Sequence, residues 1–122
     1  MNLIIAGSRD FQDYKGLSRV LKELKVLNQK ELTIISGGAR GADSIGEQWA
    51  TDHDIPLIIM PARWDLYGKS AGYRRNVEMA KQATHLVACW NGHSRGTRHM
   101  LDIAKDRGLK VYTYLYNSIF AD

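Results

Sequence analysis

Residues 32–50, LTIISGGARGADSIGEQWA, contain the pattern that decides the fold. Residues 32–35 are a short apolar run that ends in Ser36 and two glycines. An amphipathic stretch then begins at about Ala42, with Ile45 and Trp49 on one face. The apolar run is typical of a buried strand, and the spacing after the turn is typical of a helix. The stretch therefore predicts a strand, a glycine-rich turn and a helix in direct succession.

The same succession recurs along the chain. The other short apolar runs are residues 3–6, 56–60, 85–89 and 109–115. The residues at helical spacing after the first run are Leu17, Val20, Leu21, Leu24 and Leu27. We therefore expect five strands, with a helix after each of the first four.

The helices after the third and fourth runs also show an apolar face. A helix over about residues 70–82 is expected to turn Tyr73, Val77 and Ala80 toward the core. The next helix carries Thr97, Leu101 and Ala104 on one side. Gly108 is predicted to end that helix in the left-handed conformation that glycine adopts readily.

Together these elements predict an α/β fold. The apolar runs are nearly continuous in Val, Ile and Leu, which is typical of parallel strands buried on both faces. We expect a Rossmann-like three-layer sandwich with a central, mainly parallel five-stranded sheet, and residues 1–122 as a single domain. Ligands of such sheets bind beyond the carboxyl ends of the strands, so the residues after each run are the functional candidates.

Composition excludes several classes of protein. The 122 residues are 44% hydrophobic and 25% charged, as in an ordinary globular domain, and one cysteine excludes an internal disulfide scaffold. No apolar run approaches the roughly 18 residues of a membrane span, and the first residues lack a signal-peptide pattern. A cytoplasmic protein without membrane contact is expected. The net charge of +4 fits an anionic small ligand or a nucleic acid.

The turn after the second run is the strongest functional signal. Gly37, Gly38 and Gly41 allow backbone N–H groups to approach an anion, and the helix that follows offers the positive end of its dipole. Arg40 adds a fixed charge, and Asp43 is expected to cap the helix or to accept from a ribose hydroxyl. The loop lacks the pattern of a P-loop and the GxGxxG fingerprint.

Further ligand-binding candidates lie on the other turns and on the helix near residue 75. They are Gly7, Ser8, Arg9, Trp64, Lys69, Arg75, Asn76, Trp90, Gly92, Ser94, Gly96 and Thr97. Their cations, glycines and hydroxyls suit phosphate, and Trp64, Tyr67 or Trp90 would supply a face for stacking. Of Arg74 and Arg75, which are about 100° apart on a helix, only one is expected to face the cleft.

Candidates for catalysis are few. Asp43 and Glu78 could act as single acids or bases, because no paired carboxylates are evident. The four histidines lack metal-ligand spacing and no cysteine pair accompanies them, so no metal or cofactor is expected. Residues 92–96, GHSRG, match the GxSxG elbow, but no ordered Asp and His follow them, which argues against a serine hydrolase.

Taken in order, the turns form a recognisable set. The residues concerned are Gly7-Ser8-Arg9, residues 36–43, 61–64, Gly68-Lys69, Ala71-Gly72, Arg75-Asn76 with Met79, and residues 92–97. The set extends over roughly residues 2–113 and resembles the YspA-like branch of the SLOG superfamily, which also includes LOG-type nucleotide phosphoribohydrolases and DprA/Smf DNA-processing proteins. The resemblance implies a Rossmann-like fold that binds a nucleotide or an ADP-ribose-like derivative, in a homo-oligomer.

One departure bears on activity. LOG hydrolases carry a Pro-Gly-Gly-x-Gly-Thr-x-x-Glu pattern, whereas here Gly96-Thr97 is followed by Arg98, His99 and Met100, so a methionine stands at the glutamate position. This favours a binding protein that senses or sequesters a nucleotide. A hydrolase that cleaves an N-glycosidic or phosphate bond and a DprA-like single-strand binder are the alternatives, and a nucleic-acid partner is the less expected one.

Aromatic and apolar residues near the C-terminus have two interpretations. They are Tyr112, Tyr114, Tyr116, Ile119 and Phe120. They could form a subunit interface, or they could cover the edge of the sheet, and the sequence favours neither.

Overall fold

The structure is a computed structural model that describes residues 1–117. Its centre is a sheet of five parallel strands in the order β3-β2-β1-β4-β5. The strands are β1 (Asn2–Gly7), β2 (Thr33–Ser36), β3 (Leu57–Ile59), β4 (His85–Trp90) and β5 (Lys110–Leu115). The five predicted strands and the Rossmann-like α/β class are therefore confirmed.

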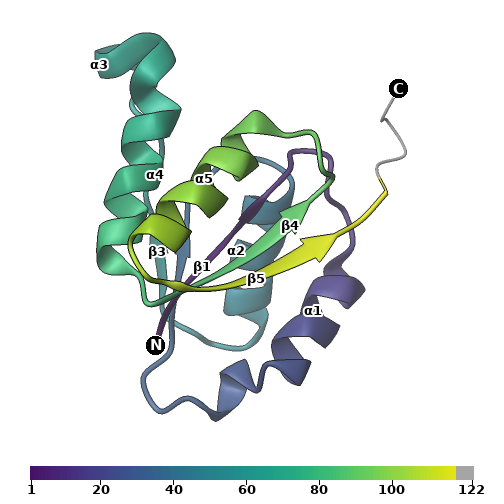
Figure 1. The fold of residues 1–122 in the computed structure, drawn as a ribbon. Coiled ribbons are helices and arrows are strands. Elements are labelled where there is room, and N and C mark those ends of the chain that lie inside the picture. Colours follow the sequence, from purple (N-terminus) through teal and green to yellow (C-terminus); the bar gives the residue numbers. More distant parts are fainter. Residues whose placement is uncertain (118–122) are drawn as a thin grey trace.

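Helices cover both faces of the sheet (Figure 1). They are α1 (Tyr14–Glu23), α2 (Ala42–Asp52), α3 (Trp64–Tyr67), α4 (Ala71–Gln82) and α5 (Arg95–Asp106), with short 3-10 helices η1 (Val26–Asn28) and η2 (Gly68–Ser70). Leu3 and Ile5 pack with α1 and α2, whereas Ile4 and Ala6 pack with α4 and α5. Alternate side chains of β1 thus enter separate cores on the two faces, which explains its continuous apolar run.

The chain reverses its direction across the sheet between β1 and β4. It moves from β1 outward through β2 to β3, then returns to β4 on the other side of β1. The loops after β1 and β4 therefore diverge at the carboxyl edge, which is where ligands bind in sheets of this topology. None of the helices within residues 1–117 is both long enough and apolar enough to cross a membrane.

The expectation for the core face of α4 was wrong. Tyr73 is 58% exposed, while Asn76, Met79 and Ala80 are buried. The two possible stripes share Ala80, and their centres are displaced by about 70° around the helix. A polar residue at position 76 made the buried stripe look hydrophilic, so the periodicity favoured the wrong one.

The helical spacing of the leucines after the first strand extends past the end of the first helix. α1 ends at Glu23, and Lys25 takes a left-handed conformation with φ of 56°. This turn places Val26 in the core and leaves Leu24 and Leu27 exposed. The leucine spacing therefore continued beyond the helix that it predicted.

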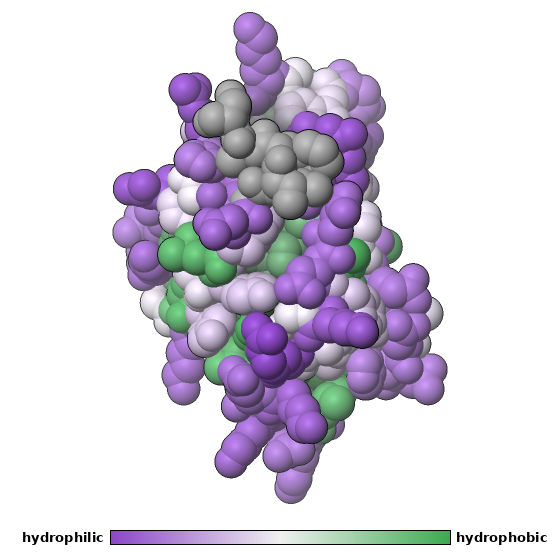
Figure 2. Space-filling view, turned by 90° about the vertical axis from the view of Figure 1, so that its right-hand side faces the viewer, coloured by the Kyte–Doolittle hydropathy of each residue, from purple (hydrophilic) through white to green (hydrophobic). Residues whose placement is uncertain are grey.

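The structure places two of the C-terminal aromatic residues, Tyr114 on β5 and Tyr116 just after it. Tyr114 and Tyr116 pack edge-on against the buried ring of Phe11, with centroids 6.1 and 5.1 Å apart. They therefore pack against the core on the face of the sheet that α1 and α2 cover. Ile119 and Phe120 lie outside the described residues. On the side of the molecule where the C-terminal segment lies, hydrophobic side chains form small patches separated by hydrophilic ones (Figure 2).

Candidate functional site

A pocket of about 660 Å³ lies at the carboxyl edge of the sheet, above the divergence of β1 and β4. This volume is within the range usual for small-molecule sites. The predicted residues that line it are Gly7, Arg9, Asp43, Trp64, Lys69, Arg75, Asn76, Ser94, Gly96 and Thr97. A hollow of about 420 Å³ shares Arg9, Trp64 and Arg75 with the pocket. It adds the predicted residues Gly37, Gly38 and Arg40.

Four predicted residues lie beside the cleft and shape its loops. Ser8 is buried, and its hydroxyl accepts from the backbone N–H of Asn91 at 3.0 Å. Trp90 donates its indole N–H to the Ser94 carbonyl at 3.1 Å, and Gly92 has a φ of 86°. Gly41 has a φ of 80°, and a side chain there would meet the Ser8 carbonyl. None of the four is among the lining residues of the pocket or the hollow.

Two amides of the glycine-rich loop, which the sequence suggested as an anion cradle, bind groups of the protein itself. The Gly38 N–H donates to Ser36 Oγ at 3.2 Å, and the Ala39 N–H donates to Asp43 Oδ2 at 3.3 Å. The Ser36 hydroxyl in turn donates to Glu47 Oε2 at 2.6 Å. Amides of this loop are thus bound to groups of the protein itself, and the loop is built to hold Asp43 in place.

Compared with the glycine-rich loop, the start of α5 leaves more backbone N–H groups available to a ligand. Ser94 caps the helix by accepting from the N–H of Thr97 at 3.3 Å and from its hydroxyl at 2.9 Å. The N–H groups of Arg95 and Gly96 belong to the first turn, which has no acceptors within the helix. Gly96 and Arg95 both line the pocket. The positive end of the α5 dipole therefore faces the cleft.

Asp43 is an unusual carboxylate because it is only 4% exposed. Burial raises its pKa to about 6, and the Ala39 N–H and the Arg75 charge offset only part of that effect. Arg75 donates to the Gly37 carbonyl through Nη1 and to Asn76 Oδ1 through Nε at 3.0 Å. Burial lowers the pKa of Arg75 from its usual value. The cleft thus holds a cation and an acid that titrates near neutral pH.

The second predicted acid lies elsewhere. Glu78 is on the exposed side of α4, where it pairs with Lys81 at 3.2 Å and lines a separate groove. Arg74 also faces that groove, and its guanidinium lies 4.4 Å from the centre of the Tyr67 ring. Arg75 faces the cleft, so the expectation that only one of the two arginines does so is confirmed. In residues 1–117, no three His, Cys, Asp or Glu side chains gather as metal ligands would.

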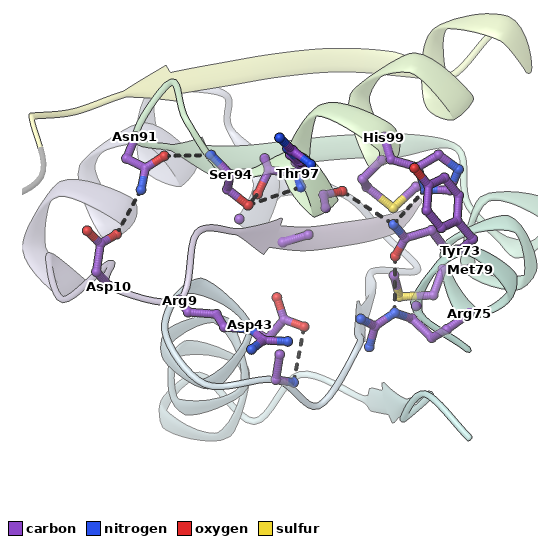
Figure 3. A pocket seen from close by; sticks show the side chains of 18 of the residues that line it. Arg9, Asp10, Asp43, Tyr73, Arg75, Met79, Asn91, Ser94, Thr97 and His99 are labelled. Carbon is purple, nitrogen blue, oxygen red and sulfur yellow. Dashed lines mark hydrogen bonds between the residues drawn. The ribbon is translucent and has the colours of Figure 1, made fainter. Parts of the chain in front are cut away.

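Several lining residues were not among the predicted ones. They are Ala6, Asp10, Ala39, Gly72, Tyr73, Met79, Asn91, Arg95, His99 and Met100. Figure 3 shows Asp10 and Asn91 at one end of the pocket and Tyr73, Met79 and His99 at the other. Asn91 donates to Asp10 at 3.3 Å, and Tyr116 donates to the same carboxylate. The spacing of Gly96 and His99, three residues apart on one helix face, was the sequence signal that could have identified the second end.

Comparisons with known proteins identify a family and a relative of the chain. Residues 1–67 match the model of a family described as the YspA, cpYpsA-related SLOG family. The chain is also similar to the Gene 61 protein of Mycobacterium phage D29, with 30% identity over 118 residues. This alignment covers 92% of the chain and 94% of the phage protein. No solved structure matches the chain.

Proposed function

The chain belongs to the YspA, cpYpsA-related SLOG family, and on that premise we propose that it binds a nucleotide or an ADP-ribose-like derivative in the cleft. Its role would be to sense or sequester that ligand without turnover. The observation that carries the proposal is the convergence of cations from separate elements on one pocket. They are Arg9, Lys69, Arg75 and Arg95.

Electrostatics favour an anionic ligand in this pocket. Its lining includes only two carboxylates, Asp10 and Asp43. Asp10 accepts hydrogen bonds from Tyr116 and Asn91, and Asp43 accepts from the Ala39 N–H and lies near the Arg75 charge. A phosphate would lie against the first turn of α5, where the amides of Arg95 and Gly96 and the helix dipole act together.

Ligand-observed proton NMR tests the proposal. The protein is mixed with AMP, ADP-ribose and cyclic mononucleotides, and the expected result is line broadening of at least one compound without new free-base or ribose signals. Arg9→Ala should weaken that binding about 10-fold or more, because a hydrogen bond to a charged group is lost. Arg74→Ala is the matched control and should bind normally, since Arg74 faces the separate groove. Absence of broadening with every compound would overturn the proposal.

A hydrolase is the second candidate, favoured by Asp43. A buried carboxyl group with a pKa of about 6 inside a pocket suits general acid or base catalysis near neutral pH. Met100 lines the same pocket, so the position of the LOG glutamate faces the cleft but carries a thioether. New free-base or ribose signals that disappear in Asp43→Asn, while line broadening remains, would establish turnover. Unchanged turnover in that variant would exclude Asp43 as the catalytic group.

We also propose that the protein forms a homo-oligomer through β3 and α3. Each of these elements carries exposed apolar side chains, with Ile58 and Ile59 of β3 at 42% and 48% exposure and Leu66 of α3 at 60%. β3 is an edge strand, so its outer side has no neighbouring strand in the sheet. An edge of this kind is a usual site of association.

A further inference from the structure

The end of the pocket between α4 and α5 differs in chemistry from the phosphate end. The rings of Tyr73 and His99 meet there, with centroids 3.7 Å apart and planes inclined by 59°. Met79 and Met100, both buried, line the same pocket. Figure 3 shows Tyr73, His99 and Met79 grouped together, away from Asp10 and Asn91. This end therefore presents aromatic and polarisable apolar surface.

Two of the three other stacking candidates are occupied or face elsewhere. Trp90 binds Ser94 through its indole N–H and does not line the pocket, and Tyr67 lies under Arg74 beside the separate groove. Trp64 does line the pocket, and its ring would lie 3.6 Å from a side chain on Gly72, next to Tyr73. Tyr73 is 58% exposed, so a face of its ring is free to receive a flat group.

Asn76 fixes the hydrogen-bonding state of His99. Arg75 Nε donates to Asn76 Oδ1 at 3.0 Å, and a guanidinium can only donate. The amide nitrogen must therefore face the other way, where it lies 3.4 Å from the Gly96 carbonyl and 3.1 Å from His99 Nδ1. Because an amide N–H₂ only donates, Nδ1 must be the acceptor and the ring proton is on Nε2.

This arrangement keeps His99 neutral, with its Nε2–H as a hydrogen-bond donor. Protonation of Nδ1 would set two donors against each other at 3.1 Å, and burial also lowers the pKa of His99. Its Nε2–H is then available to an acceptor atom in the pocket. Asn76 is only 6% exposed, so water has little access to replace these contacts.

The two ends of the pocket are close enough for one small ligand. Asn76 contacts both Gly96, in the first turn of α5, and His99, three residues later. Three residues advance a helix by about 4.5 Å along its axis. The phosphate end and the aromatic end are thus separated by little more than the length of a sugar ring.

We propose that Tyr73 and His99 form the subsite for the heterocyclic base of the ligand, in which the base stacks on Tyr73 and a ring acceptor receives the His99 Nε2–H. The ligand class is accordingly a nucleoside 5′-phosphate with its phosphate at the start of α5. The proposal rests on the proposed function, because it assigns the base end of the same cleft.

Calorimetric titration of the full chain with AMP, GMP, CMP, UMP and ribose 5-phosphate tests it. At least one nucleotide should bind about 10-fold more tightly than ribose 5-phosphate, which lacks the base. Tyr73→Ala should weaken the binding of that nucleotide by about 5- to 150-fold, the range that base–aromatic stacking supplies. The affinity for ribose 5-phosphate should stay unchanged. Tyr73→Phe should retain the affinity.

His99→Phe keeps a ring but removes the N–H donor, and it should weaken the binding of the same nucleotide by about 2- to 10-fold. Tyr112→Ala, on β5 and outside the pocket lining, is the control and should bind as the unaltered protein does. Equal affinity for nucleotides and ribose 5-phosphate would overturn the base subsite while leaving the proposed function intact. The same holds if Tyr73→Ala weakens the binding of the nucleotide and of ribose 5-phosphate equally. Failure of all five compounds to bind would overturn the base subsite, and failure of ADP-ribose in the NMR experiment as well would overturn the proposed function.

Discussion

At the scale of single residues, Gly41 and Gly96 have different roles although both were candidates for ligand contact. Gly41 has a φ of 80°, and a Cβ there would lie 2.4 Å from the Ser8 carbonyl oxygen. Gly96 has no atom within 4 Å of the corresponding position. Gly41 therefore lets the second loop pass close to the first, and Gly96 is a helix residue that faces the pocket.

We predict that Gly41→Ala lowers the free energy of unfolding by about 1–3 kcal/mol or more, because it combines backbone strain with a clash against main-chain atoms. Gly96→Ala should change it by less than about 1 kcal/mol. Urea unfolding followed by circular dichroism measures both. Equal effects of the two substitutions would contradict the assigned roles.

Asp43 should make stability depend on pH. Its pKa rises from 3.8 to about 6 on folding. Between these values the folded protein retains a proton that the unfolded chain has lost, so the free energy of unfolding falls as pH rises from about 4 to 6. The full effect is up to about 3 kcal/mol. Asp43→Asn should remove this slope and be the more stable protein at pH 7.

Urea midpoints at pH 4, 5, 6 and 7 measure this slope. Asp106→Asn, on the exposed surface of α5, should keep the slope of the unaltered protein. A slope that survives in Asp43→Asn would show that another group is responsible.

At the scale of elements, hydrophobic runs and glycine turns were sufficient to predict all five strands and the loops of the cleft. The runs of β1, β2 and β4 are largely buried, so their sequences directly reflect their environment, whereas β3 and β5 are edge strands with exposed residues. The face of α4 and the end of α1 could not be predicted in this way. The first depends on the contacts of a buried asparagine with Gly96 and His99, and the second on a left-handed lysine that is followed by the core residue Val26.

The same reason explains why the aromatic end of the pocket was not predicted. Tyr73 and His99 lie on different helices, 26 positions apart, and only the packing of α4 against α5 brings their rings together. The phosphate end was easier to predict, because residues 94–97 are contiguous. Its chemistry follows from the local start of a helix.

The start of α5 allows a prediction about an element. Ser94→Ala removes the acceptor of the Thr97 N–H and should lower the free energy of unfolding by about 1 kcal/mol, the usual value of a helix cap. Ser70→Ala is the matched variant, since Ser70 precedes α4 without a capping hydrogen bond. Thermal unfolding should show a clearly smaller loss for Ser70→Ala, and a loss as large as that of Ser94→Ala would contradict the cap.

At the scale of the whole molecule, the proposed association through β3 and α3 predicts a change of mass. Ile58→Lys combined with Leu66→Glu places charges on two exposed apolar positions and should convert the oligomer to a monomer. Light scattering after size-exclusion chromatography measures the mass. Leu115→Glu, an equally exposed position on β5 at 62%, is the control and should leave the oligomer intact. A monomer in the unaltered protein would refute the proposal.

The whole fold directs several loops to one edge of the sheet, and we propose that this edge binds a nucleotide phosphate. The most direct measurement is a titration of the protein with AMP, followed by the amide chemical shifts of Arg95 and Gly96 at the start of α5 and of Gly108 just beyond its other end. We expect saturable changes in the amide chemical shifts of Arg95 and Gly96 and no change at Gly108. Shifts confined to Gly108 and other residues remote from the cleft, or no shifts at all, would contradict it.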